Sequence, residues 1–175
     1  MWTTKLLTVM AFVAILGIGC SDREEKKPGP AKSGAAPAAI KLNFPHVIPM
    51  SADTPHNIGN FDQSTGTMAA GKDQAGALVF GPYLELDPGR YQVTFDIKTG
   101  GGKEPIIGKV DVNAFSEAQS DNPVAEQELR RAKNDQSITL DFSAVAGKKY
   151  EFRVWVNGNG DLSVKKITVD RKTQS

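Results

Sequence analysis

Apolar and polar side chains alternate along most of the chain after residue 40. In the clearest run, Arg90 to Ile97, every second residue is apolar: Tyr91, Val93, Phe95 and Ile97. A period of two is typical of a β-strand with one buried and one hydrated face. The same alternation predicts three further strands, whose inward residues are Val110, Val112 and Ala114, then Ile138, Leu140 and Phe142, then Phe152, Val154 and Val156.

Shorter segments extend this pattern at both ends of the domain. Ala77 to Phe80 and Tyr83 to Leu86 predict a broken strand pair around Gly81 and Pro82. Near the C-terminus the apolar period changes phase at Lys165-Lys166, between Leu162 and Val164 on one side and Ile167 and Val169 on the other. A phase change inside a strand predicts a β-bulge there.

The stretch from Glu117 to Ala132 has good helix formers but no apolar stripe. We interpret Val124 to Arg131 as an edge strand that follows a loop. In total the pattern predicts about eight or nine short strands with turn signals between them and almost no helix. The expected fold class is all-β, an antiparallel β-sandwich.

The N-terminus has a different composition. Leu6 to Ile18 is apolar behind Lys5 and is shorter than the about 20 residues that a membrane-spanning helix needs, so residues 1–19 are expected to be a signal peptide. Residues 20–39 are charged and then rich in Pro, Gly and Ala, which predicts an unfolded tether. The β-sandwich domain is expected over residues 40–175.

Leu16-Gly17-Ile18-Gly19-Cys20 resembles the lipobox of bacterial lipoproteins, with the leucine one position further from the cysteine than is usual. The resemblance implies a lipidated Cys20, palmitate included, and a membrane anchor in the bacterial cell envelope. Ser21 after the cysteine resembles the outer-membrane sorting pattern of enteric bacteria better than inner-membrane retention. The expected location is therefore the outer membrane or the periplasmic face and not the cytoplasm. The alternative is ordinary cleavage near Gly19, which would leave a free thiol.

The charge balance excludes one class of partner. Lys plus Arg total 21 and Asp plus Glu total 20, whereas binding to nucleic acid requires a concentrated basic surface. Nucleic acid is therefore not an expected partner.

Cys20 is the single cysteine, so no intramolecular disulfide can form. The domain must therefore be stabilised by its core.

Trp155 is the best candidate for ligand contact. It lies between the inward Val154 and Val156, so the alternation places its indole on the opposite face together with Arg153. An indole can stack on the apolar face of a sugar while neighbouring polar groups bind the hydroxyls. The alternative is that a loop or the tether covers Trp155.

Other patterns are better explained as structure. Asn157 to Asp161 lacks the glycine and glutamate of a calcium loop and is expected to be a hairpin turn. Thr99 to Lys103 lacks the features of a phosphate loop and is also interpreted as a hairpin connection. No metal site is expected from His46, Asp53 and His56, which we place in a surface loop, and no catalysis from Glu126 and Glu128. No cofactor or enzyme activity is predicted.

The segment Gly76 to Phe95, with its Gly81-Pro82-Tyr83 and Leu86 to Phe95 motifs, resembles a jelly-roll segment of bacterial carbohydrate-binding-module-like (galactose-binding-like) domains. Tyr150 to Val156 and Asp161 to Val164 resemble the closing strands of that fold, and the resemblance spans Pro55 to Asp170. It implies a jelly roll. Together with the lipobox-like segment, it leads us to expect a non-catalytic envelope lipoprotein whose candidate ligand is an envelope glycan. The alternative is a structural module that docks an envelope protein and binds no sugar.

Overall fold

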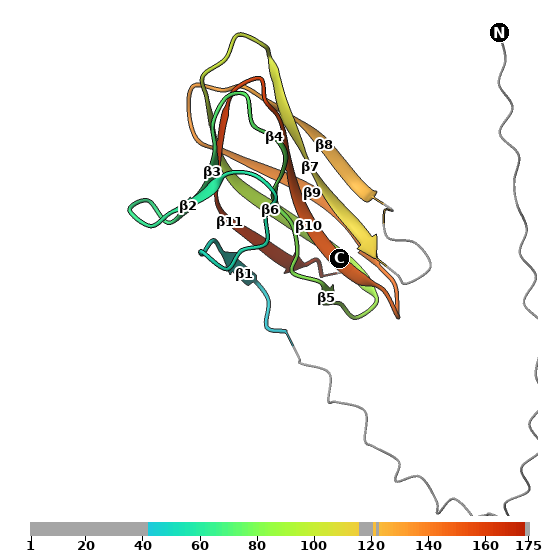
Figure 1. The fold of residues 1–175 in the computed structure, drawn as a ribbon. Helices are drawn as coiled ribbons and strands as arrows, with labels where there is room; N and C mark the ends of the chain where they lie inside the picture. The colour runs from blue at the N-terminus through green and yellow to red at the C-terminus, as the bar shows by residue number, and fades with distance from the viewer. Residues whose placement is uncertain (1–41, 116–120, 122, 174–175) are drawn as a thin grey trace, which may run out of the picture. The chain divides into compact units, whose positions relative to one another are not determined.

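The computed structural model describes residues 42–115, 121 and 123–173. These residues form eleven β-strands and no helix (Figure 1), and so none that could span a membrane. The predicted signal peptide, Cys20 and the tether lie outside the described residues. The all-β prediction is confirmed, with more strands than expected because several of them have only two to four residues.

The strands form two antiparallel sheets that pack as a sandwich. The six-stranded sheet has the order β2-β3-β11-β6-β9, with β1 also paired to β11. Its members are β1 (His46–Pro49), β2 (Asn60–Asp62), β3 (Thr67–Ala70), β6 (Gly89–Gly100), β9 (Gln136–Ala144) and β11 (Asp161–Arg171). The five-stranded sheet has the order β4-β10-β7-β8, with β5 also paired to β10. Its members are β4 (Ala75–Val79), β5 (Leu84–Glu85), β7 (Ile106–Phe115), β8 (Pro123–Arg130) and β10 (Lys149–Asn157).

The core lies between the two sheets and is made by the alternating residues. All the predicted inward residues of β6, β7, β10 and β11 are buried, and on β9 Leu140 and Phe142 are buried while Ile138 is half-buried. Aromatic rings connect the sheets, because Phe142 of β9 lies 6.1 Å from Phe152 of β10 and 5.7 Å from Tyr91 of β6 between ring centroids. The hydrophobic pattern therefore predicted the core correctly.

Three local predictions are confirmed by the order and register of the strands. The pairing of β11 with β6 shifts between Val164 and Lys166, which is the predicted β-bulge. The strand predicted from Val124 to Arg131 is β8, and it lies at the edge of the five-stranded sheet. The predicted broken pair forms β4 and β5, which pair with different parts of β10.

Both predicted hairpin connections are wrong. β6 and β7 belong to different sheets, and so do β10 and β11, so Thr99 to Lys103 and Asn157 to Asp161 each carry the chain from one sheet to the other. The two connections pack against each other, since a Cβ added at Gly102, whose φ is +68°, would collide with the carbonyl oxygen of Asn159. A turn motif specifies a reversal of the chain, and it does not specify which sheet the next strand joins.

The burial of the core side chains predicts how much stability is lost when one of them is truncated. Phe152→Ala should lower the free energy of unfolding by about 3–5 kcal/mol, because it leaves a cavity between the sheets. Val145→Ala is the matched control, since Val145 is 52% exposed in the turn before β10 and should change stability by about 0.5 kcal/mol or less. Urea unfolding followed by circular dichroism measures both, and equal effects would contradict this description of the core.

Candidate functional site

The outer face of the five-stranded sheet carries a buried layer of charged and polar groups. The alternation predicts that the outward residues of β7 and β10 are hydrated. Instead, Asp111 and Asn113 are 0% exposed, Glu151 is 5% and Arg153 is 8% exposed. The expectation of a wet face is therefore wrong at the centre of this sheet. Burial is tolerated because these side chains satisfy one another, and every buried side-chain polar atom described has a partner.

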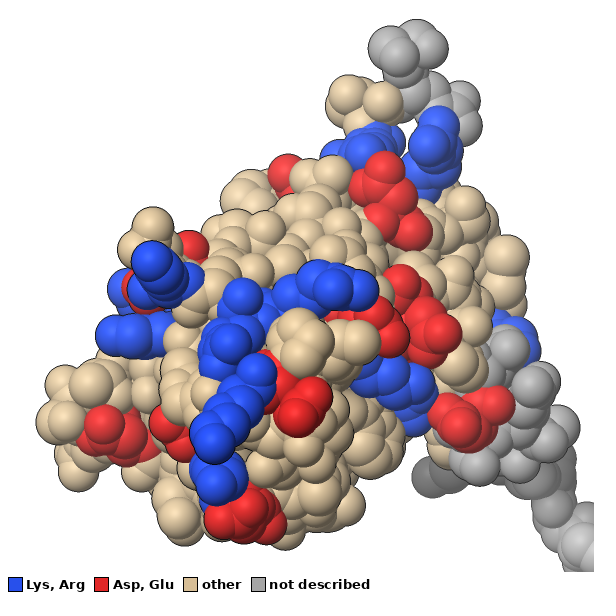
Figure 2. Space-filling view, turned by 90° about the horizontal axis from the view of Figure 1, so that it is seen from above, with Lys and Arg blue, Asp and Glu red and all other residues tan. Residues whose placement is uncertain are grey.

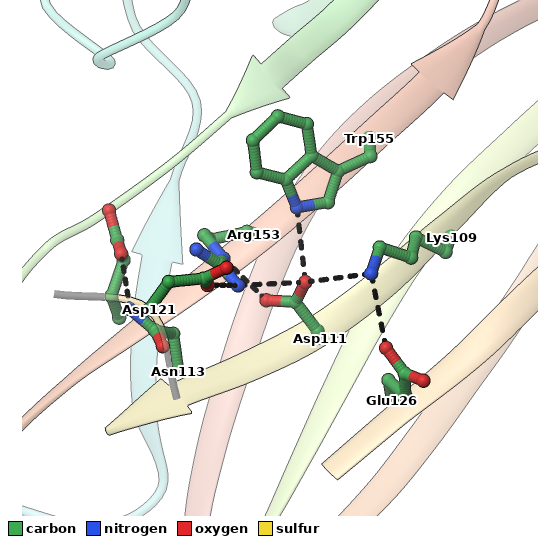
Figure 3. Close-up of polar contacts among 8 residues, drawn as sticks. Lys109, Asp111, Asn113, Asp121, Glu126, Arg153 and Trp155 are labelled. Carbon is green, nitrogen blue, oxygen red and sulfur yellow. Dashed lines mark hydrogen bonds and ion pairs between the residues drawn. The ribbon is translucent and has the colours of Figure 1, made fainter. Parts of the chain in front are cut away.

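Asp111 is the centre of this layer (Figure 3). Its carboxylate accepts two hydrogen bonds from Arg153, from Nε at 2.6 Å and from Nη2 at 3.1 Å. It also accepts a hydrogen bond from the indole Nε1 of Trp155 at 3.0 Å, and Lys109 Nζ lies 3.9 Å away. Three neighbouring side chains are thus held by one carboxylate.

Arg153 connects this buried carboxylate to the surface. Its Nη2 also donates to Asp121 at 2.9 Å, and the side chain of Asp121 is 73% exposed. Burial by itself lowers the pKa of Arg153, but the hydrogen bonds and charges of Asp111 and Asp121 outweigh it, so the pKa lies above its usual value. The guanidinium is therefore a permanent cation with a fixed position.

Trp155 and Arg153 lie on the same face of β10 and in contact with each other. The Arg153 guanidinium carbon is 5.3 Å from the centre of the indole ring, a distance at which a cation interacts with an aromatic face. Trp155 is half-buried, and its N–H is already used by Asp111. The indole can thus offer apolar surface to a ligand. Ligand binding by Trp155 and Arg153 stays a prediction.

Tyr83 is a second aromatic group at this face, and it was missed from the sequence. It is 49% exposed, and its ring packs edge-on against Phe115 with 5.4 Å between the ring centroids. Burial raises the pKa of the Tyr83 phenol, and a hydrogen bond to the Glu151 carboxylate and the negative charge of Glu151 raise it further. Glu151 in turn accepts a hydrogen bond from Asn113 at 3.1 Å. From the sequence, the Gly81-Pro82-Tyr83 motif indicates the fold and does not single out Tyr83 for ligand contact.

The edge strand β8 supplies charged groups beside the buried layer. Glu126 lies 3.1 Å from Lys109 Nζ, and Glu128 lies 3.5 Å from Arg130. Both carboxylates are thus held in exposed ion pairs, which are typical of a protected sheet edge.

The histidines take part in local structure. His46 begins β1, so its prediction as a loop residue is wrong, while His56 lies in a loop with Nδ1 2.6 Å from the carbonyl oxygen of Thr54. In the described part of the chain, no three His, Cys, Asp or Glu side chains are grouped as metal ligands. In the view of Figure 2, several basic side chains follow one another in a curved row, and acidic side chains lie beside this row.

Comparison with solved structures places the fold among carbohydrate-binding modules. BiXyn10A CBM1 in its apo form is similar with a TM-score of 0.52 and 11% identity, over 73% of this chain and 98% of that chain. A family 35 carbohydrate binding module from an environmental isolate has a TM-score of 0.50 and 12% identity, over 74% of this chain and 99% of that chain. No protein-family model and no curated protein matches the chain. The predicted jelly-roll sandwich is confirmed as the fold.

Two carboxylates on the same guanidinium allow a matched test of the buried layer. Asp111→Asn should destabilise the protein by about 3–5 kcal/mol, because the buried cation loses its main partner. Asp121→Asn should cost about 1 kcal/mol or less, because that carboxylate is exposed to solvent. Chemical denaturation measures both free energies of unfolding.

The double variant Asp111→Asn with Arg153→Met should be more stable than Asp111→Asn alone, because it also removes the unpaired cation. Similar losses for the two aspartate variants, or additive losses in the double variant, would contradict the central role of Asp111.

Proposed function

We propose that this chain is a non-catalytic carbohydrate-binding protein whose ligand lies on the outer face of the five-stranded sheet. The observation that carries this proposal is the pairing of two accessible aromatic side chains, Trp155 and Tyr83, with a fixed polar strip between them. Aromatic rings stack on the apolar faces of sugars, and oriented polar groups beside them bind hydroxyls. The similarity to carbohydrate-binding modules supports the fold that this proposal needs.

The spacing of the aromatic groups favours an oligosaccharide. Tyr83 is hydrogen-bonded to Glu151, and Glu151 and Trp155 are four positions apart on β10. At about 3.3 Å per residue this separation is about 13 Å, which is longer than one pyranose ring. A chain of sugar units aligned with β10 would contact both aromatic groups and pass over Arg153.

The charges at this face favour a neutral glycan. In the layer around Asp111 the cations are Arg153 and Lys109, while the carboxylates are Asp111, Asp121, Glu126 and Glu151. The two cations are already engaged by these carboxylates, so a ligand carboxylate would meet net repulsion. Neutral polysaccharides therefore fit this face better than acidic ones.

The location that we propose is the bacterial cell envelope, with the domain attached to a membrane through a lipidated Cys20. The lipobox-like Leu16 to Cys20 segment and the Pro-rich, Ala-rich residues after it support this proposal. Several acyl chains on one cysteine give stable membrane anchoring, whereas a single chain binds only marginally. A tethered sugar-binding domain would hold its glycan close to the membrane.

Sugar binding is tested by calorimetric titration of the chain with neutral and acidic envelope oligosaccharides. Trp155→Ala and Tyr83→Ala should each weaken binding of a neutral oligosaccharide by about tenfold or more, because each removes a stacking surface. Tyr83→Phe keeps the ring and is the matched control, so it should retain most of the affinity.

Unchanged affinity in both alanine variants would overturn the proposed face. Absence of any glycan binding would overturn the function and leave protein docking as the alternative.

Anchoring is tested by mass spectrometry of the chain expressed in a bacterium. The mature protein should begin at Cys20, carry acyl chains and partition into the membrane fraction. Cys20→Ser should remove the acyl mass and release the protein from that fraction. A mature N-terminus elsewhere, or an unmodified thiol on Cys20, would refute the anchor.

A further inference from the structure

A second groove lies on the outer face of the six-stranded sheet, on the other side of the sandwich from Trp155. Its volume is about 580 Å³. The β2–β3 hairpin forms one wall through Asp62 and Thr65. Asp135, which directly precedes β9, and Ser137 in β9 form the other wall. The floor comes from β3, β11 and β6.

The groove is hollow because small side chains meet in register across its floor. Ala69 of β3 lies opposite Ser163 of β11, and Ser163 lies opposite Lys98 of β6. Cross-strand neighbours in such a row have Cβ atoms about 5 Å apart. Short side chains at Ala69 and Ser163 therefore leave space beside the longer Lys98.

The β-bulge in β11 places two consecutive lysines at this surface. Lys166 lies 3.4 Å from Asp96 and neutralises it, while the additional residue, Lys165, lines the groove. Among the residues that the structure describes, Lys98, Lys165 and Ser163 have no hydrogen-bond or ion-pair partner for their side chains. Bulges often redirect a side chain toward a functional site.

Two of the three acidic groups that line the groove are already occupied. Asp62 accepts hydrogen bonds from the hydroxyls of Ser64 and Thr65, at 2.6 Å and 2.8 Å. Asp96 accepts one from Ser137 at 2.7 Å, in addition to its contact with Lys166. Asp135 is exposed and keeps its acceptors for a ligand hydroxyl. None of the described residues that line the groove is aromatic, so we expect a ligand there to be held by polar contacts.

We propose that this groove is a second binding site, for a saccharide that bears a carboxylate. Lys98 and Lys165 donate to the carboxylate, the hydroxyl of Ser163 between them donates a further hydrogen bond, and Asp135 accepts from a sugar hydroxyl. This site differs in face and in ligand charge from the neutral-sugar surface at Trp155, and it does not depend on that surface. A chain with both sites would bind two kinds of glycan at once.

The test uses a uronic acid trisaccharide as the probe and the neutral trisaccharide of the same sugars with its carboxyl groups reduced as the comparison. Amide chemical shifts in nuclear magnetic resonance spectra locate each probe on the isotope-labelled chain. The uronic acid probe should shift residues of β6 and β11 around Lys98 and Ser163, and the reduced probe should bind this groove much more weakly.

Lys98→Gln and Lys165→Gln should each weaken binding of the uronic acid probe by about fivefold. Lys148→Gln, the matched control, makes the same charge change in the β9–β10 turn outside the groove and should leave the affinity unchanged. Equal binding of both probes, an equal effect of Lys148→Gln, or no shifts at the groove would overturn this proposal. Trp155→Ala separates the two sites, because it should weaken binding of the neutral oligosaccharide and leave binding of the uronic acid probe at Lys98 unchanged.

Discussion

The carboxylate of Asp111 is buried on the outer face of a sheet, and that burial constrains everything around it. An unpaired charge at this depth would cost several kcal/mol, so its partners must be fixed in place. Arg153 supplies two hydrogen bonds and Trp155 supplies one. Because each partner stands on β10 opposite β7, the strand register itself sets the geometry of the layer. Slippage by one residue would bury the wrong side chains.

This constraint bears on the ligand contact that we propose for the half-buried Trp155. A tryptophan with an unused N–H would need a water molecule or a ligand group to satisfy it. Here the N–H is occupied by Asp111, and the ring is held against Arg153. The indole is therefore ordered when the chain folds. Binding of a ligand would not carry the entropy cost of ordering this side chain, which favours affinity for that ligand.

The sequence predicts which residues point inward and where the bulge lies, but it does not predict which sheet each strand joins. The alternation in β6, β7 and β10 identifies the inward residues because the pleat imposes a period of two on any half-buried strand. The bulge in β11 is visible because it changes the phase of that period. The sequence does not show which sheet each strand joins. It therefore predicts hairpins after Gly100 and Asn157, where the chain in fact crosses from one sheet to the other. Local sequence carries the turn, and long-range packing decides the sheet.

The candidate site shows the same division. Alternation places Arg153 and Trp155 together because both are outward residues of one strand, and that statement needs no knowledge of neighbouring strands. Asp111 stands on another strand, and its role depends on lying opposite Arg153 in the register. A polar residue in an outward position predicts hydration unless its partner is known. Tyr83 is harder still to predict as part of this face, because it lies in the segment between β4 and β5 and not on β7 or β10. Residues that act through pairing across strands are therefore the ones that a single sequence conceals, and in this protein they are the residues that shape the proposed sugar-binding face.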